Sequence, residues 1–313
     1  MSEALVILCP GQGAQSVGMG KRWYEQSPEA RAVFDRAEDL LGDRLACSLK
    51  TACFEGPEEL INRTDVAQPA LYVCGVASFV GRFGNPGERN LGATAGLSLG
   101  EYTALHLAGA FSFEDGLELV TVRGRAMQDA AEASDSGMVA LIGADEAQAD
   151  EVCRRAGAGD VLVPANYNAP GQIVLSGSKT AVDRAAGVAG EMGLRAAVLA
   201  VAGAFHSPLM APAGERLREV LERVEIREPR CPVLSNVTGV AHGTGPDVAH
   251  PIERSIRDRL VEQLTAPVRW AQGCAWLVGA VSGAYHELAP GKVLSGLMRR
   301  IDREVKVASH ADP

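Results

Sequence analysis

A Gly-x-Ser-x-Gly pentapeptide, Gly96-Leu97-Ser98-Leu99-Gly100, constrains this chain more than any other segment. It follows the apolar run 91–95 and precedes a nearly uncharged run, 101–110, that is typical of a buried helix. Glycines on both sides allow the backbone to turn sharply from a strand into a helix. We therefore predict a nucleophile elbow with Ser98 at its tip, an arrangement suited to acyl transfer through a serine ester.

The same residues allow a second interpretation. Ser98 and Glu101 have the spacing of a capping box, in which the serine side chain only caps the helix that follows. The pentapeptide alone does not decide between a nucleophile and a cap, so other features of the chain must be weighed with it.

Composition bounds the class of protein. The chain has 313 residues, of which 47% are hydrophobic and 22% charged, and its net charge is -9. These values are typical of a globular protein of about two domains, and the acidic charge argues against nucleic-acid binding. The stretch 196–214 has no charged residue, but it contains His206 and two prolines. It is better interpreted as a buried strand that runs into a loop than as a membrane span.

Cysteine usage and the first residues indicate a cytoplasmic protein. There are seven cysteines, an odd number, and none forms a Cys-x-x-Cys pair. This pattern argues against a disulfide framework and against a zinc site, so we expect free thiols in a reducing compartment. The start, Met1-Ser2-Glu3, lacks the basic segment of a signal peptide.

The order of expected elements predicts an α/β fold with two domains. An apolar strand at 4–9 ends in the tight loop 10–13, and helices and strands then alternate. Residues 137–201 have the order β-α-β-β-α-β, which is the ferredoxin-like signature. Its expected strands are 138–142, 161–163, 173–175 and 196–201, its helices are 145–156 and 180–192, and a loop covers 166–171.

We therefore predict a small domain at 137–201, inserted into a large domain formed by 1–136 and 202–313. In the large domain, further strands are expected at 232–236 and 284–288, and a last helix follows the loop 289–292. Reactive loops should lie at the carboxyl ends of the strands.

Three more segments can supply the chemistry that a serine nucleophile needs. His206 ends an apolar strand and is a candidate base, although a capping or solvated histidine would have the same pattern, and five other histidines exist. Arg123 lies in an apolar helical pattern and could bind a carboxylate, or it could pair with Glu118 or Asp129 on a helix surface. The Gly-rich loop 11–15 lacks the P-loop pattern and is better suited to donate to an oxyanion.

Taken together, seven motifs in this order resemble those of the malonyl-CoA:acyl carrier protein transacylases, over nearly the whole chain. They are Gly11-Gln12-Gly13-Ala14-Gln15, Gly96-Leu97-Ser98-Leu99-Gly100-Glu101-Tyr102, Arg123-Gly124, Asn166-Tyr167-Asn168-Ala169-Pro170-Gly171-Gln172, Phe205-His206-Ser207, Gln263-Leu264 with Pro267-Val268-Arg269-Trp270, and Pro290-Gly291-Lys292-Val293-Leu294. The fold implied by this resemblance is an α/β-hydrolase-like large domain with an inserted ferredoxin-like small domain.

The resemblance also implies a role for each site residue. Ser98 is the nucleophile and His206 the base, and the main-chain carbonyl of Gln263 orients His206 in place of an acid. The N–H groups of Gln12 and Leu99 form the oxyanion hole, and Arg123 holds the malonyl carboxylate. The other implied substrate-binding residues are Met127, Phe205 and Asn168. Leu97 stands where many members have histidine, while Leu99 and Phe205 resemble malonyl-type rather than methylmalonyl-type enzymes.

The implied reaction is a ping-pong transfer of malonyl from malonyl-CoA to the phosphopantetheine thiol of acyl carrier protein, for fatty-acid or polyketide synthesis. It requires no cofactor and no metal, and the expected enzyme is a monomer. A serine hydrolase or thioesterase would share the Ser-His pair, and a non-catalytic docking module is a third possibility. Basic residues expected to meet the acidic carrier protein are Lys179, Arg184, Arg195, Lys292, Arg299 and Arg300.

Overall fold

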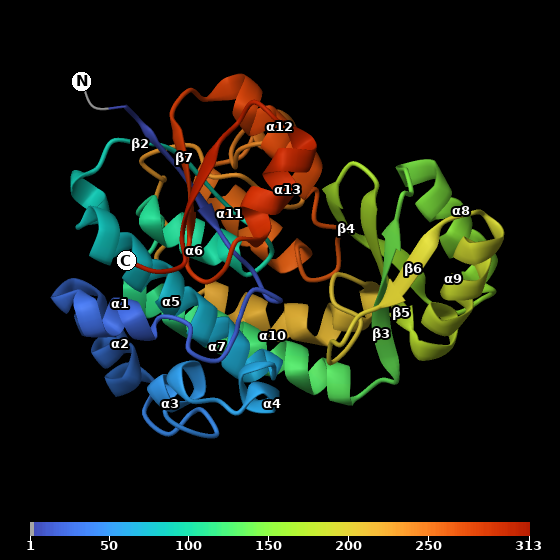
Figure 1. Ribbon diagram of the computed structural model, residues 1–313, viewed down its shortest axis with the longest axis horizontal. Helices are drawn as coiled ribbons and strands as arrows, with labels where there is room; N and C mark the ends of the chain where they lie inside the picture. Colours follow the sequence, from blue (N-terminus) through green and yellow to red (C-terminus); the bar gives the residue numbers. More distant parts are fainter. Residues whose placement is uncertain (1–2) are drawn as a thin grey trace.

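The computed structural model describes residues 3–313 and contains two β-sheets, each surrounded by its own helices (Figure 1). The first sheet has the order β2-β1-β7-β8, and its neighbouring strands all run parallel. Its strands are β1 (Leu5–Cys9), β2 (Leu91–Gly96), β7 (Ala284–Leu288) and β8 (Val307–His310).

Helices form most of the larger part of the molecule, which we define as residues 3–135 and 199–313. Before the second sheet they are α1 (Lys21–Gln26), α2 (Pro28–Leu41), α3 (Leu49–Phe54), α4 (Glu58–Ile61), α5 (Thr64–Phe83), η1 (Pro86–Glu88), α6 (Gly100–Leu107) and α7 (Phe113–Glu132). After it they are η2 (Pro208–Met210), α10 (Ala211–Leu221), η3 (Gly245–Asp247), α11 (Ile252–Glu262), α12 (Trp270–Ala280) and α13 (Val293–Ile301).

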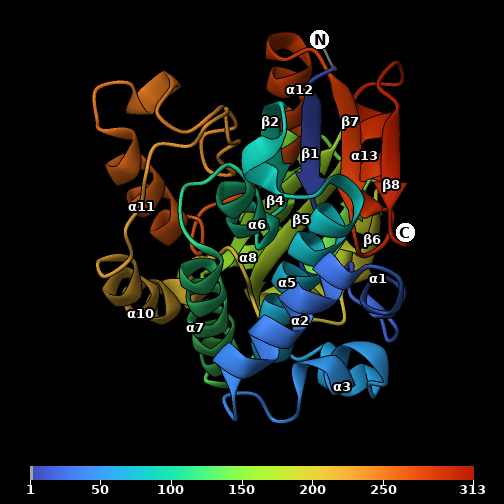
Figure 2. The same cartoon turned by 90° about the vertical axis from the view of Figure 1, so that its left-hand side faces the viewer.

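Both faces of the parallel sheet are covered, which explains the apolar run at the start of the chain. Along β1, Ile7 and Cys9 pack into the core formed with α2, α5, α6 and α7. The alternate residues Val6 and Leu8 pack against α12 and α13 (Figure 2). Because successive side chains of a strand point to opposite faces, a strand between two helical layers must be apolar at every position.

The second sheet and two helices form the smaller part, residues 136–198. Its elements are β3 (Ser136–Ile142), α8 (Glu146–Gly157), β4 (Leu162–Ala169), β5 (Gln172–Ser178), α9 (Lys179–Glu191) and β6 (Arg195–Val198). The sheet is antiparallel with the order β4-β5-β3-β6. The expected β-α-β-β-α-β order and the α/β fold class are confirmed, whereas 137–201 as the exact extent of a separate domain stays a prediction.

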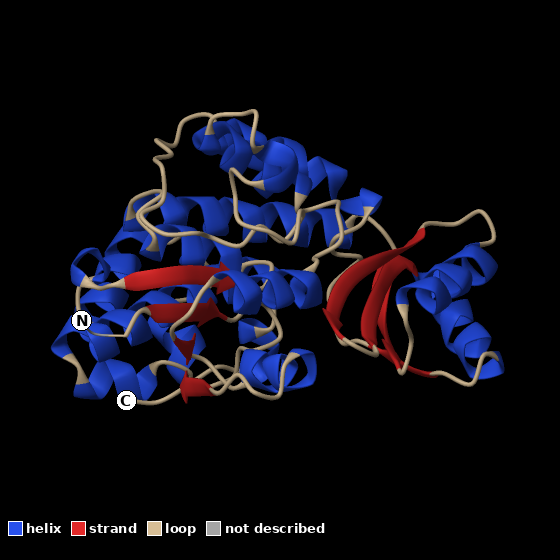
Figure 3. Cartoon of the chain, turned by 90° about the horizontal axis from the view of Figure 1, so that it is seen from above, coloured by secondary structure: helices blue, strands red, loops and turns tan. Residues whose placement is uncertain are grey.

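Side chains along the strands of this sheet alternate between its two faces, and those of one face point toward the site. Val139 and Leu141 of β3 pack against α8 and α9, whereas Met138 and Ala140 belong to the core shared with the larger part. Figure 3 shows the helices of the smaller part on the outer face of the sheet, with its other face turned toward the larger part. Side chains from this inner face therefore meet loops from the carboxyl edge of the parallel sheet.

Three expectations about local structure are wrong. The strand expected at 196–201 to be buried is β6, which ends at Val198 and is mostly exposed. Residues 166–169 are not in a loop but in β4, where two register shifts toward β5 interrupt the apolar-polar alternation that would have marked a strand. The expected strand 232–236 does not form; Val233 makes only an isolated bridge to Thr94. Pro232 lacks an N–H group, and Ser235 already turns back to bond Val240, so the pairing ends after one residue.

One helix, α5, is long and apolar enough to cross a membrane by length and composition alone. In the structure, 78% of the apolar window of this helix is buried inside the protein. It packs between α2 and α7 and therefore acts as a core helix of the larger part.

Candidate active site

Ser98 lies at the turn between β2 and α6, at the carboxyl edge of the parallel sheet. Its φ of 51° is in the left-handed region, which is uncommon for a residue other than glycine. A Cβ at Gly96 would lie 1.9 Å from the carbonyl carbon of Gly100, and a Cβ at Gly100 would lie 2.1 Å from the oxygen of Cys9. Both flanking glycines are thus required by close backbone contacts, as expected for a nucleophile elbow.

The alternative that Ser98 only caps α6 is wrong. Leu99 occupies the N-cap position, and no side chain among residues 3–313 caps this helix. The Ser98 hydroxyl instead lies 2.9 Å from Nε2 of His206 and 3.1 Å from Nη2 of Arg123. The serine oxygen is therefore held by a histidine and a guanidinium.

His206 is held in the tautomer that a general base requires. Its Nδ1 lies 2.7 Å from the main-chain oxygen of Gln263. A carbonyl oxygen only accepts hydrogen bonds, so Nδ1 carries the proton and Nε2 offers its lone pair to Ser98. Burial and the nearby charge of Arg123 lower the pKa of His206 to about 4, although the bond to Gln263 opposes this shift. None of the other five histidines contacts Ser98 within the described residues.

Arg123 is a buried guanidinium that contacts no carboxylate among residues 3–313. It is 1% exposed and donates to Oε1 of Gln68 at 2.7 Å and to Oε1 of Gln263 at 2.9 Å, besides its contact with Ser98. Its Nε has no partner within the described residues, and its pKa is lowered mainly by burial. The surface ion pairs with Glu118 or Asp129 do not form. A buried cation without an anion in contact favours an anionic ligand.

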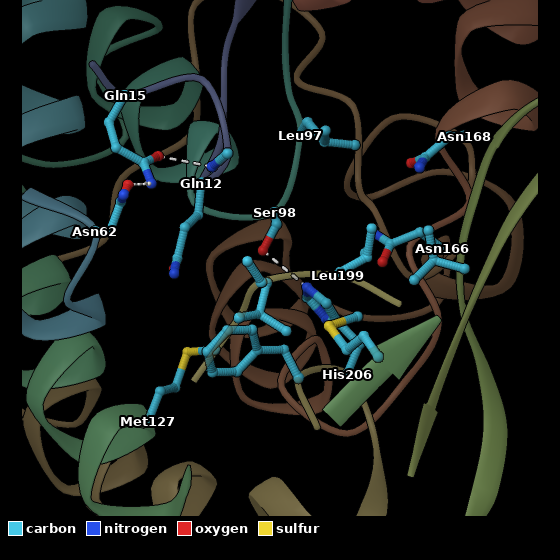
Figure 4. A pocket seen from close by; sticks show the side chains of 16 residues that line it. Gln12, Gln15, Asn62, Leu97, Ser98, Met127, Asn166, Asn168, Leu199 and His206 are labelled. Carbon is cyan, nitrogen blue, oxygen red and sulfur yellow. Dashed lines mark hydrogen bonds between the residues drawn. The ribbon is translucent and has the colours of Figure 1, made fainter. Parts of the chain in front are cut away.

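A cavity of about 320 Å³ opens onto Ser98 and His206 (Figure 4). One side is formed by the loop after β1 and by Asn62, and the other by strands of the antiparallel sheet and residues 199–201. The lining residues are Gln12, Gly13, Gln15, Asn62, Leu97, Ser98, Met127, Met138, Asn166, Asn168, Val174, Leu199, Ala200, Val201, Phe205 and His206. Met127, Phe205 and Asn168 thus line the cavity, whereas Arg123 contacts Ser98 without lining it, and the role of all four in substrate binding stays a prediction.

The proposed oxyanion donors occupy suitable places, although their role stays a prediction. Gln12 lies in the loop after β1 and lines the cavity, and its side chain donates to Thr64 at 3.2 Å. Leu99 follows Ser98 at the start of α6, where the N–H groups of a helix lack intrahelical partners. The backbone segments of Gln12 and Leu99 therefore both lie at the carboxyl edge of the parallel sheet, next to the nucleophile.

Residues that the sequence analysis did not select complete the site. Asn236 accepts from the N–H of Ser98 at 2.6 Å and donates to the oxygen of Gly96 at 2.7 Å, so its side chain clamps the elbow. Gln68 is the partner of Arg123 and is a polar residue in the apolar run of α5, which was an available signal. Asn236 had no comparable signal, because it contacts a residue 138 positions away.

The described part of the chain contains no candidate metal cluster and no disulfide bond. Within residues 3–313, no cluster of three or more His, Cys, Asp or Glu side chains could hold a metal ion. The seven cysteines are all free.

An elbow serine, a neutral histidine base and a buried guanidinium define a site for serine-dependent acyl transfer. The chain belongs to the acyl transferase family, because the acyl transferase domain matches residues 6–306. It is 39% identical over 311 residues to the malonyl CoA-acyl carrier protein transacylase of Bacillus subtilis, covering 99% of this chain and 94% of that protein.

Solved structures agree with this assignment. The malonyl-CoA:acyl carrier protein transacylase of Xanthomonas oryzae matches with a TM-score of 0.89 and 41% identity, covering 100% of this chain and 96% of the other. A malonyl-transacylase solved in complex with a type II polyketide acyl-carrier protein matches with a TM-score of 0.89 and 35% identity, covering 99% and 96%. The protein is therefore an acyltransferase with the two-part fold of these enzymes.

The pH dependence of Ser98 reactivity tests the state of His206. The base is active only when neutral, so lowering its pKa from 6.5 to about 4 moves the loss of activity to lower pH. We expect the rate of Ser98 modification by phenylmethanesulfonyl fluoride, which has no titrating group, to stay near its plateau at pH 6 and to fall toward pH 4. Circular dichroism at each pH checks that the fold persists. Half-maximal reactivity near pH 6.5 would contradict a desolvated His206.

Proposed function

We propose that this chain transfers the malonyl group of malonyl-CoA to the phosphopantetheine thiol of acyl carrier protein, through a malonyl ester of Ser98. The observation that carries the proposal is the Arg123 guanidinium, which is buried, contacts no carboxylate and lies 3.1 Å from the nucleophile. A malonyl group differs from an acetyl group by one terminal carboxylate, and a guanidinium binds a carboxylate through two parallel hydrogen bonds. The names of the relatives support the same substrates.

In the first half-reaction, Ser98 Oγ attacks the thioester carbon of malonyl-CoA while Nε2 of His206 takes the hydroxyl proton. The negative charge that develops on the carbonyl oxygen is stabilised by the N–H groups of Gln12 and Leu99. Collapse of the tetrahedral intermediate breaks the carbon–sulfur bond, and His206 returns its proton to the sulfur of the leaving CoA. The products are malonyl-Ser98, neutral His206 and CoA.

The second half-reaction runs the same steps with a different thiol. The phosphopantetheine thiol of the carrier protein gives its proton to His206 and attacks the ester carbon of malonyl-Ser98. The carbon–oxygen bond breaks, the proton passes to Ser98 Oγ, and malonyl leaves on the carrier. Arg123 holds the carboxylate in both halves, so the acyl carbon keeps its orientation between the two attacks. Met127, Phe205 and Asn168 contact the acyl group or the pantetheine arm from the cavity walls.

The proposal also covers the cofactor requirement, the location, the oligomeric state and the domains of the enzyme. The reaction balances without a cofactor or a metal, since protons and acyl groups are all that move. We propose a cytoplasmic monomer whose domains are 1–136 with 202–313, and 137–201. The cavity lies between these two units, so both thiol substrates would reach Ser98 between them.

The main alternative is a serine hydrolase or thioesterase, in which water attacks the acyl ester. Such enzymes orient their histidine with a carboxylate, whereas His206 is oriented by the carbonyl of Gln263. A hydrolase of uncharged acyl esters would also gain nothing from a buried guanidinium beside the serine. A purely docking role is disfavoured because Ser98, His206 and Arg123 are all in contact distance.

Of the six basic residues expected to meet an acidic carrier protein, three are engaged elsewhere. Lys179 pairs with Asp183, Arg184 pairs with Asp160 at 2.7 Å, and Arg300 donates to Gln172 at 2.8 Å. Arg195, Lys292 and Arg299 form no salt bridge within the described residues and are the better candidates. Their role in docking stays a prediction.

Replacing Ser98 tests the covalent step. Ser98→Ala removes the nucleophile without changing the backbone of the elbow, so the variant should fold and form no acyl-enzyme. Intact mass spectrometry should show one malonyl adduct on the parent after malonyl-CoA is added, and loss of that adduct when holo carrier protein follows. The Ser98→Ala protein should show neither event. A malonyl adduct mapped to another residue, or an adduct released by water but not by carrier protein, would contradict the proposal.

Replacing Arg123 tests the selectivity for a carboxylate. Arg123→Ala should lower kcat/KM for malonyl-CoA far more than for acetyl-CoA, because only malonyl loses a charged partner. Breaking such a pair costs ~2–5 kcal/mol, so the ratio of the two kcat/KM values should fall by roughly 30-fold or more. Arg125→Ala, on the exposed side of the same helix, is the matched control and should leave the ratio unchanged. Equal losses with both substrates would mean that Arg123 is structural.

A further inference from the structure

Glu101 is a buried carboxyl group that the reaction described above does not use. It lies in the first turn of α6, three residues after the nucleophile, is 1% exposed and does not line the cavity. Its Oε1 lies 2.7 Å from Nε2 of His242. Its Oε2 accepts from Nε2 of Gln263 at 2.6 Å and from the N–H of Asn236 at 3.2 Å. Within the described residues it contacts no lysine or arginine, and its only ion-pair partner is the buried His242.

The contact with Gln263 connects Glu101 to the base and to the guanidinium. The Gln263 amide lies between two charged groups: its Nε2 donates to Glu101, and its Oε1 accepts from Arg123 at 2.9 Å. The main-chain oxygen of the same residue orients His206. An amide can reverse its two ends, but a carboxyl group that accepts from Nε2 fixes the end that faces Arg123 as the oxygen. Glu101 and Arg123 together thereby fix the orientation of the Gln263 amide, and Glu101 anchors the side chain of the residue whose main-chain oxygen orients His206.

The contact with Asn236 connects Glu101 to the nucleophile. Asn236 donates its main-chain N–H to Glu101, and its side chain spans the elbow from the N–H of Ser98 to the oxygen of Gly96. Gln263 also donates to the main-chain oxygen of Ser98 at 3.1 Å. The two loop segments that contain Asn236 and Gln263 are thus tied to one carboxyl group at the start of the nucleophile's helix.

Charge adds to this geometry. Burial lowers the pKa of Arg123, and the charge of Glu101 opposes that shift, so Glu101 helps the guanidinium to stay protonated. Glutamine at position 101 is neutral and has a single acceptor oxygen, so it cannot accept from His242 on one side and from Gln263 and Asn236 on the other.

We propose that Glu101 is the positioning residue of this site, acting through Gln263 and Asn236 to fix His206, Arg123 and Ser98 relative to one another. In a serine triad an acid contacts the histidine directly, whereas Glu101 acts on His206 through one intervening residue, Gln263. The inference rests on the proposed roles of Ser98 and His206, and its test does not require that malonyl be the substrate.

The experiment compares Glu101→Gln with the parent and with Glu287→Gln. Glu287 is a buried carboxyl group at the end of β7 that accepts from the N–H groups of Leu294 and Ser295, away from Ser98 and His206. For each protein we would measure the melting temperature, the rate of Ser98 modification by phenylmethanesulfonyl fluoride, and kcat/KM for malonyl-CoA with holo carrier protein. The sulfonyl fluoride has no carboxylate, so its rate reports on the Ser98–His206 pair without any contribution from substrate binding to Arg123.

We expect Glu101→Gln to fold and to lose about 10–100-fold in both rates, the range known for groups that orient a metal-ligating side chain. Glu287→Gln should show a lower melting temperature with parental sulfonylation. If Glu101→Gln folds and is sulfonylated at the parental rate, Glu101 is structural and the proposal is overturned. A parent that is sulfonylated but transfers no malonyl would refute the proposed function and leave this test intact.

A second variant covers the case in which Glu101→Gln does not fold. Gln263→Met keeps the main-chain carbonyl that orients His206 but removes the amide between Glu101 and Arg123. We expect it to slow sulfonylation at least tenfold. Parental sulfonylation in Gln263→Met would overturn the proposal.

Discussion

Burial of the Arg123 guanidinium without a carboxylate in contact is the constraint on which the active site depends. Removing a cation from water is costly unless polar groups and an opposite charge compensate. In this protein the compensation comes from neutral oxygens of Gln68, Gln263 and Ser98, and from the face of Tyr102, whose ring centroid lies 5.3 Å from the guanidinium carbon. The cation is therefore desolvated and only partly satisfied, which favours a substrate that brings its own carboxylate.

The two sheets make this arrangement possible because the carboxyl edge of the parallel sheet meets the inner face of the antiparallel sheet. The parallel sheet supplies the loop after β1 and the elbow after β2, both at its carboxyl edge. The antiparallel sheet turns Met138, Asn166 and Val174 toward the same cavity. His206 lies just after the chain returns from the smaller part, with a φ of 56° in the left-handed region. Two residues with strained backbones, Ser98 and His206, thus face each other where the two parts of the fold join.

Sequence reasoning could find the residues that carry the chemistry, because each is marked by local pattern. Ser98 is marked by its glycines, and the fold class follows from the order of apolar runs. The motif resemblance supplied the roles of Gln263, Met127 and Asn168, which no spacing would have indicated. The groups that brace the site were missed: Gln68 stands out as a polar residue in the apolar run of α5, but its partner Arg123 is 55 residues away, and Asn236 is 138 residues from Ser98. Such distances are set by the packing of helices and loops and leave no periodic signal.

Errors in secondary structure have the same origin. Residues 166–169 of β4 include two asparagines, so they lack the alternation of a strand and were expected to form a loop. The edge strand β8 has four residues and forms only because Tyr285–Leu288 of β7 offers an open edge, so it was not expected at all. In both cases, pairing with a neighbouring strand overrides a weak local preference.

A crystal structure of the malonyl-enzyme, trapped after malonyl-CoA is added in the absence of carrier protein, tests the central claim most directly. The account predicts an ester on Ser98 Oγ whose terminal carboxylate accepts two hydrogen bonds from Arg123 at about 2.7–2.9 Å. The guanidinium would then have exchanged its contact with the serine oxygen for the substrate carboxylate. An ester whose carboxylate points away from Arg123, toward Gln15 and Asn62 at the far wall of the cavity, would contradict it.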